Sequence, residues 1–127
     1  MNIFSLFCSA PVAKLPSYTR SEISYSAKEF INKLECVKDA GGERGRKVSY
    51  IYEKTENYAR KIAKSAEKGN IKDTRKNIER FKKYSNDLFS AAKNPSAKSA
   101  IAATGVERDN ILSAFYEFIA YRNFFNH

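Results

Sequence analysis

The stretch AKSAEKGNIKDTRKNI, residues 63–78, predicts two helices that meet at a short turn. On each side of the turn, apolar residues recur every three or four positions, which is the spacing of one helix face. Gly69 marks the end of the first helix, because glycine adopts the left-handed backbone of such an end without steric cost. Asn70 begins the second helix, with Asp73 in its first turn. The connection between the two helices is therefore very short.

The same spacing continues in both directions and predicts four helical segments. The stripe of the first segment comprises Ile23, Ala27, Phe30, Ile31, Leu34 and Val37, and that of the second comprises Val48, Ile51, Thr55, Tyr58, Ile62 and Ala66. The third stripe comprises Ile71, Thr74, Ile78, Phe81, Ser85, Leu88, Phe89 and Ala92, and the fourth comprises Ile111, Leu112, Phe115, Phe118 and Ile119. No segment shows the alternation that is typical of a strand.

Several segment boundaries carry their own signals. Two pairs of residues have the spacing of a capping box, which predicts a helix start: Thr19 with Glu22, and Thr104 with Glu107. Gly41 is the expected end of the first helix. Residues 96–105, SAKSAIAATG, fit either a short helix or a loop, because their periodicity does not decide between them.

Helices with such wide apolar stripes bury them best against one another, as an antiparallel bundle with short connections. A chain of 127 residues has the size of one domain. We therefore predict an all-α fold, an antiparallel bundle of four main helices over residues 19–127, preceded by an apolar N-terminal arm over residues 1–18. Its core is expected to contain Leu34, Ile62, Ile78 and Phe115.

The cysteines and the N-terminus bear on the compartment. Cys8 and Cys36 are too few for a disulfide framework and have no neighbouring Cys or His to form a metal site, so we expect free thiols, no metal and no cofactor. The arm lacks the positive region of a signal peptide, and no apolar run reaches the length of a membrane span. These features favour a cytoplasmic protein without a transmembrane segment, and leave export by a non-classical route open.

Positive charge is concentrated in the middle of the chain. The net charge is +9, and residues 38–83 contain 15 Lys and Arg residues against 7 Asp and Glu residues, which is +8 of that total. A field of this sign attracts polyanions, whether RNA, DNA or an acidic protein surface. The charge therefore indicates a class of partner and says little about the fold.

The spacing of these cations predicts a binding face on the second and third helices. In the second helix lysines recur every seven residues, which places them in a line along one side. The third helix contributes a second basic face, and the preceding GGERGRK segment adds two arginines. The candidate polyanion-binding residues are Arg44, Arg46, Lys47, Lys54, Lys61, Lys68, Lys72, Lys76, Arg80 and Lys83.

The alternative interpretation is the ordinary solvated face of a bundle. Glu53, Glu56, Glu67 and Glu79 lie among the lysines, where they could form ion pairs with neighbours four residues away. We recognise no combination of Arg and aromatic residues that reads bases, so binding to nucleic acid would have little sequence specificity.

The fourth helix has a different character. Six of the 17 aromatic residues lie within eleven positions near the C-terminus: Phe115, Tyr116, Phe118, Tyr121, Phe124 and Phe125. A helix that is apolar nearly all round lies at the centre of a bundle or forms a second contact surface. It is therefore a candidate surface for a homodimer.

The same helix ends in Arg122-Asn123, followed four positions later by His127. This pattern, late in a small helical bundle, resembles the signature of the HEPN domain family. The resemblance implies an all-α bundle that commonly dimerises and a metal-independent ribonuclease activity. It also implies that His127 transfers a proton, that Arg122 holds the scissile phosphate, and that Asn123 is the polar residue that often follows the Arg. In that family the chain normally continues beyond the His, whereas this sequence ends there.

Three hypotheses follow, in order of preference. The first is a small basic interaction protein that binds nucleic acid or an acidic protein surface through its second and third helices, of a kind frequent among accessory proteins of phages, plasmids and bacterial effectors. The second is the HEPN-like ribonuclease with Arg122 and His127. The third is a structural subunit of a larger assembly, joined through its aromatic helix.

Overall fold

The structure is a computed structural model that describes residues 14–40, 46–92 and 95–125, without the side chains of residues 37–40, 46, 47, 96, 97 and 121–125. It contains the helices α2 (Ser17–Ala40), α3 (Arg46–Glu67), α4 (Ile71–Ala91), α5 (Pro95–Ala103) and α6 (Gly105–Phe125). No strand occurs in these ranges, and the one isolated backbone bridge joins Lys14 to Asn70. The prediction of an all-α fold is confirmed.

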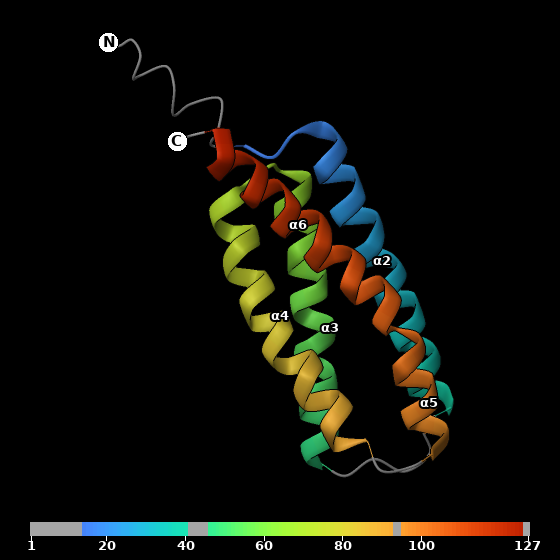
Figure 1. The fold of residues 1–127 in the computed structure, drawn as a ribbon. Coiled ribbons are helices and arrows are strands. Elements are labelled where there is room, and N and C mark those ends of the chain that lie inside the picture. Colours follow the sequence, from blue (N-terminus) through green and yellow to red (C-terminus); the bar gives the residue numbers. More distant parts are fainter. Residues whose placement is uncertain (1–13, 41–45, 93–94, 126–127) are drawn as a thin grey trace.

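The helices form an antiparallel bundle (Figure 1). α2, α3 and α4 alternate in direction, and α5 and α6 return along the remaining edge. α2 packs along both α3 and α6, while α3 packs along α4. Residues 96–105, for which the sequence allowed a helix or a loop, contribute to the short helix α5. None of the described helices is long and apolar enough to span a membrane.

The predicted stripes form the core. Leu34, Ile62, Ile78 and Phe115, one from each main helix, have no exposed surface. The ring of Phe81 meets Phe30 edge to face at 5.0 Å between centroids, an arrangement that aromatic quadrupoles favour. Some residues of the stripes are only partly buried: Val48, Tyr58, Phe89, Ala92, Leu112, Phe118 and Ile119. Helical spacing therefore identified the core correctly, and Val37 lies among the residues whose side chains are not described.

The α3–α4 turn has the geometry that its sequence predicts. Gly69 has a φ of +73°, in the left-handed region that favours glycine. The Asn70 side chain accepts a hydrogen bond from Asp73 N at 2.9 Å and so caps α4. Leu15 N donates to Gly69 O at 3.1 Å, and the Leu15 side chain is buried. The turn thus also holds the residues that lead into α2.

One predicted helix start needs correction, and the other, with Thr104 directly before the helix, is confirmed. α2 begins at Ser17, two residues before the predicted cap Thr19, because Pro16 O already accepts a hydrogen bond from Arg20 N at 2.9 Å. Thr104 does precede α6, but its hydroxyl donates to Ile101 O at 2.6 Å and therefore closes the end of α5. The predicted helix end at Gly41 lies outside the described residues.

Long side chains connect α4 with α6. Arg108 Nη1 donates to Asn86 Oδ1 at 2.7 Å, and the Arg108 guanidinium lies 5.2 Å from the centroid of the Phe89 ring. The Tyr116 hydroxyl donates to Glu79 Oε2 at 3.0 Å. Burial and the Glu79 carboxylate raise the pKa of Tyr116 above the ordinary value of 10.0.

Candidate nucleic-acid interface

The buried stripe of α3 leaves two flanks, one beside α2 and one beside α4. The flank beside α2 carries Arg60 and Glu67, which contact α2 side chains. The flank beside α4 carries Lys54, Lys61 and Lys68, because a spacing of seven residues returns almost to the same side of a helix. The two flanks differ in how their charges are compensated.

On the α2 flank, opposite charges are paired. Lys28 Nζ lies 2.7 Å from Glu67 Oε2, and the Ser24 hydroxyl donates to the same oxygen at 2.6 Å. These two contacts, Lys28 foremost, lower the pKa of Glu67. Arg60 forms an ion pair with Glu56 and lies 3.8 Å from Glu35. Lys28 and Arg60 are therefore already neutralised by carboxylates within the protein.

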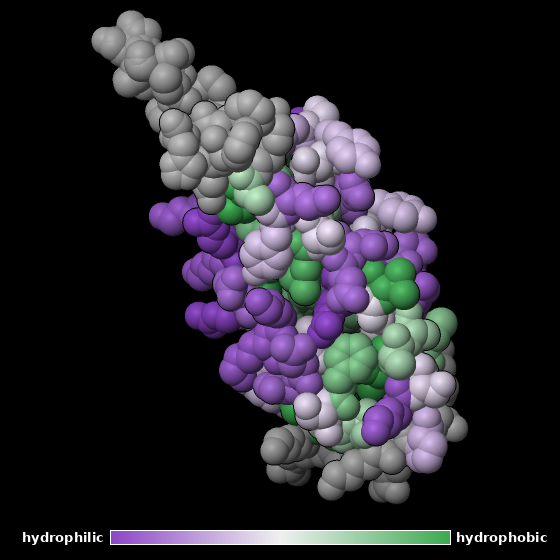
Figure 2. Space-filling model, in the orientation of Figure 1, coloured by the Kyte–Doolittle hydropathy of each residue, from purple (hydrophilic) through white to green (hydrophobic). Residues whose placement is uncertain are grey.

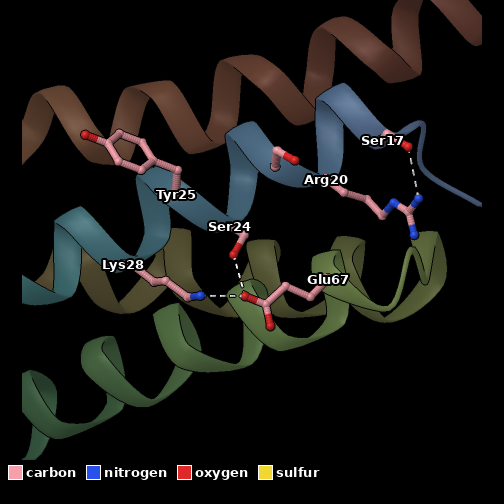
Figure 3. Close-up of a pocket in the computed structure, with 7 residues that line it drawn as sticks. Ser17, Arg20, Ser24, Tyr25, Lys28 and Glu67 are labelled. Atoms are coloured by element: carbon pink, nitrogen blue, oxygen red, sulfur yellow. Dashed lines mark hydrogen bonds and ion pairs between the residues drawn. The ribbon is translucent and has the colours of Figure 1, made fainter.

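A shallow groove lies on this paired side (Figure 3). The Glu67 carboxylate reaches Lys28 and Ser24 across it, while Arg20 donates to the Ser17 hydroxyl at 3.2 Å. Tyr25 points away from these residues. An internal carboxylate therefore compensates Lys28, whereas Arg20 has no carboxylate oxygen of a described residue within 4.0 Å.

On the α4 flank, uncharged hydrogen bonds join the helices. Asn77 Nδ2 donates to Lys61 O at 3.3 Å, and the Thr74 hydroxyl donates to Ser65 Oγ at 3.1 Å. Among the residues that the structure describes, no ion pair crosses between α3 and α4. The seam between these helices therefore does not neutralise the lysines beside it.

We define the basic face as the predicted binding residues of α3 and α4 whose side chains are described: Lys54, Lys61, Lys68, Lys72, Lys76, Arg80 and Lys83. All are exposed except Lys54, which is half-buried. Lys83 pairs with Asp87 at 3.2 Å. The other six have no carboxylate oxygen of a described residue within 4.0 Å. Figure 2 shows hydrophilic side chains gathered over the α4 edge of the molecule.

The acidic residues that could have neutralised this face have other contacts. Glu56 pairs with Arg60, four residues away, as helical spacing allows, but on the α2 flank. Glu67 pairs with Lys28 of α2, and Glu79 accepts a hydrogen bond from Tyr116 of α6. The predicted pairing with a neighbour four residues away is therefore found for Glu56, whereas Glu67 and Glu79 have partners on other helices.

Three tyrosines lie together on the same side of the α3–α4 hairpin, and sequence reasoning did not find them. The Tyr58 and Tyr84 rings are stacked, 5.7 Å apart between centroids and 7° from parallel. The Tyr50 ring meets Tyr84 edge to face at 6.5 Å. We call Tyr50, Tyr58 and Tyr84 the tyrosine cluster. The turn at Gly69 contained the missing signal, because residues nearly equidistant from it, such as Ser65 and Thr74, are neighbours across the hairpin.

Each tyrosine of the cluster carries a lysine of the basic face. Lys54 Nζ lies 5.5 Å from the centroid of the Tyr50 ring, and Lys61 Nζ lies 4.9 Å from that of Tyr58. The third contact, between Lys83 Nζ and the Tyr84 ring, measures 4.7 Å. These are cation–π distances. The surface thus combines ammonium groups with aromatic rings at close range.

The remaining predicted site residues cannot be placed in this surface. Arg44 lies outside the described residues, and Arg46 and Lys47 belong to the first turn of α3 without described side chains. Arg122 lies in the last part of α6, also without a described side chain, and His127 is outside the described residues. The geometry of the predicted ribonuclease pair therefore stays a prediction.

Comparison with known proteins adds no relative to these observations. No protein-family model, no curated protein sequence and no solved structure matches the chain.

Proposed function

We propose that the protein binds nucleic acid through the basic face of α3 and α4. The observation that carries the proposal is the difference between the two flanks of α3. Lysines beside α4 lack carboxylate partners among the described residues, whereas Lys28 and Arg60 beside α2 are paired. Cations without internal partners are available to neutralise phosphates.

The chemistry of the face fits a phosphate backbone. Lys and Arg bound to phosphates release counterions, and this sequence-independent gain dominates the affinity of basic surfaces. Lysines that follow the length of a helix can contact successive phosphates of one strand. An acidic protein surface would satisfy the same charges, but it has no nucleic-acid bases that could stack on the tyrosine cluster beside them. The cluster therefore favours nucleic acid over an acidic protein as the partner.

Salt titration tests this proposal. Binding of the purified protein to fluorescent single-stranded and double-stranded oligonucleotides is measured by anisotropy over a range of salt concentrations. We expect the logarithm of the association constant to fall linearly with the logarithm of salt concentration, by about 0.7 per phosphate contact for a single strand and about 0.9 for a duplex. Absence of binding even at low ionic strength would overturn the proposal and leave the acidic protein as the partner.

A HEPN-like ribonuclease is our second proposal, and it rests on the Arg122-Asn123 to His127 pattern at the end of α6. On this proposal the basic face holds RNA, the Arg122 guanidinium binds the scissile phosphate, and the His127 imidazole transfers the proton. Total RNA incubated with the protein in EDTA would be cleaved, and His127→Ala would abolish cleavage without changing the melting temperature. Intact RNA after incubation with the wild-type protein would exclude it.

Location and assembly are parts of the same proposal. A cytoplasmic protein meets nucleic acid directly, and the exposed, free thiol of Cys36 is compatible with a reducing compartment. A homodimer through α6 is also part of the proposal, and this helix packs mainly on α2 while Arg108 and Tyr116 reach α4.

A further inference from the structure

We propose that the tyrosine cluster is a stacking platform for unpaired bases, so that the nucleic acid bound by this protein is single-stranded. This inference rests on the proposed function and identifies its substrate class. It requires that the rings be accessible, that their present neighbours be displaceable, and that the surrounding charges lie where the strand's phosphates would be.

The rings are partly accessible because the cluster lies at the edge of the core, against which Tyr58 packs. Tyr50 is 54 % exposed, and Tyr58 and Tyr84 are half-buried. The interior between α3 and α4 is already filled by fully buried side chains, among them Ile62, Ile78 and Phe81. The fold therefore places three partly exposed aromatic rings at the surface, of which Tyr58 also packs against the core.

The neighbours that now cover the rings are flexible. Lys54, Lys61 and Lys83 each hold an ammonium near one tyrosine ring, at 4.7 to 5.5 Å from the centroid. A cation–π contact at an exposed site is weaker than the stacking of a nucleic-acid base on an aromatic side chain. A base can therefore replace the ammonium on the ring.

The displaced lysine then has a second partner close by. In a single strand each base is attached to its own phosphate, so an ammonium that leaves the ring can bind the phosphate of the base that replaced it. Lys61 is joined to the cluster through Tyr58, and Lys68 continues the same line along α3. Rings and cations thus alternate in the manner of surfaces that bind single strands without sequence readout.

A duplex cannot use this arrangement, because its bases are already stacked and paired. An acidic peptide would bind the lysines alone. For both of these ligands the tyrosine rings should be dispensable, whereas for a single strand they should contribute to affinity. The contribution of the rings therefore separates the inference from the proposed function.

The test compares two leucine variants and one ring-preserving variant with three kinds of probe. The variants are Tyr58→Leu with Tyr84→Leu, which removes the stacked pair, and Tyr18→Leu, a control tyrosine on α2 that is 76 % exposed. The probes are a pyrimidine single strand, an abasic strand of the same length and charge, and a duplex. RNA and DNA versions of the single strand distinguish the two sources of unpaired bases. Circular dichroism and urea denaturation establish that each variant is folded, and Tyr58→Phe with Tyr84→Phe serves as a ring-preserving variant.

We expect the double leucine variant to bind the pyrimidine strand roughly tenfold more weakly or worse, by loss of base stacking. Its affinity for the abasic strand and the duplex should be unchanged, and the phenylalanine and Tyr18 variants should bind like the wild type. The sequence contains no Trp, so tyrosine fluorescence can be read directly. It should be quenched by the pyrimidine strand and not by the abasic one.

The outcomes are distinct. If the leucine variant binds all probes like the wild type while salt still weakens binding, the stacking inference is wrong and the phosphate-binding proposal stands. If the wild-type protein binds no probe, both are wrong. Equal losses for the pyrimidine and abasic strands would show that the substitutions disturb the lysines, and would also overturn the inference.

Discussion

The two flanks of α3 differ in how their basic side chains are paired. Beside α2, Lys28 and Arg60 each have a carboxylate partner, and the Ser24 hydroxyl adds a hydrogen bond to Glu67. Beside α4, uncharged Thr, Ser and Asn side chains make the contacts between helices, and the lysines stand over tyrosine rings. The same helix thus has one self-neutralised flank and one uncompensated flank.

Stability does not explain this difference. Exposed ion pairs contribute only about 0 to 1 kcal/mol each, so pairing or not pairing the lysines changes the free energy of unfolding little. The hydrophobic core beneath both flanks is shared and supplies most of the stability. What the unpaired flank retains is the ability to bind an external anion. The substitutions below change either the core and turn that the two flanks share or the side chains of one flank alone.

The largest effect is expected from the shared core. Phe81 is fully buried and packs edge to face on Phe30. Phe81→Ala should lower the free energy of unfolding by about 3 to 5 kcal/mol, a large part of the stability of an ordinary domain. Urea denaturation followed by circular dichroism measures this loss. A loss below 1 kcal/mol would mean that Phe81 does not pack against Phe30 in the core as described.

The next effect concerns the turn that aligns the α4 flank. Gly69→Ala places a side chain at φ +73° and should destabilise the protein by about 1 to 2 kcal/mol. Gly105→Ala is the matched control, because its added Cβ meets no atom within 4 Å and its φ is not positive. We expect the control to be neutral or to stabilise by up to about 1 kcal/mol. Equal losses in the two variants, measured by thermal melting, would contradict the account of the turn.

Single lysine changes should then distinguish the flanks. Lys28→Gln removes the ion pair with Glu67 and should cost a few tenths of a kcal/mol, discounted because both side chains are exposed. Lys61→Gln removes a cation without a described carboxylate partner and should be neutral or slightly stabilising, since it lowers repulsion among like charges. Urea denaturation at low salt gives both values. The opposite order would mean that the α4 flank is the paired one.

The smallest expected effect depends on pH. Because Lys28 and Ser24 lower the pKa of Glu67, this group contributes stability above the ordinary value of 4.5, and loses it as the pH falls through the lowered pKa. The stability difference between the wild type and Glu67→Gln should therefore shrink between about pH 6 and about pH 3, by less than about 1 kcal/mol. A difference that grows on acidification would contradict the pairing of the α2 flank.

The sequence predicted the helices and their core well, and the candidate binding surface only in part. Buried positions such as Ile62 and Ile78 follow from helical spacing, and the turn follows from Gly69 and Asn70, because these are local properties of the chain. The start of α2 was misplaced, because Pro16 supplies the first accepting carbonyl and the Thr19 signal is not used.

The compensation of charge was beyond sequence reasoning, because it depends on which helices are neighbours. Glu67 and Glu79 stand among lysines in the sequence, yet α2 and α6 provide their partners. The tyrosine cluster could not be predicted for the same reason, since Tyr58 and Tyr84 are 26 positions apart and meet only because α3 and α4 form a hairpin. The charged residues could be counted from the sequence, whereas their ion-pair partners are known only from the packing of the helices.

The most direct test of the central claim removes the same charge either from two unpaired lysines of the α4 flank or from two paired lysines of α2. Lys61→Gln with Lys68→Gln changes the α4 flank, and Lys28→Gln with Lys33→Gln changes cations that pair with Glu67 and Glu107. Both double variants have the same net charge. We measure the salt dependence of their binding to a pyrimidine single strand. The account predicts that the first variant binds more weakly and loses about 1.4 from the log–log salt slope, at 0.7 for each lost phosphate contact, while the second keeps the wild-type slope. Equal losses in the two variants would show that only the total charge matters, and would contradict a binding surface on the uncompensated flank.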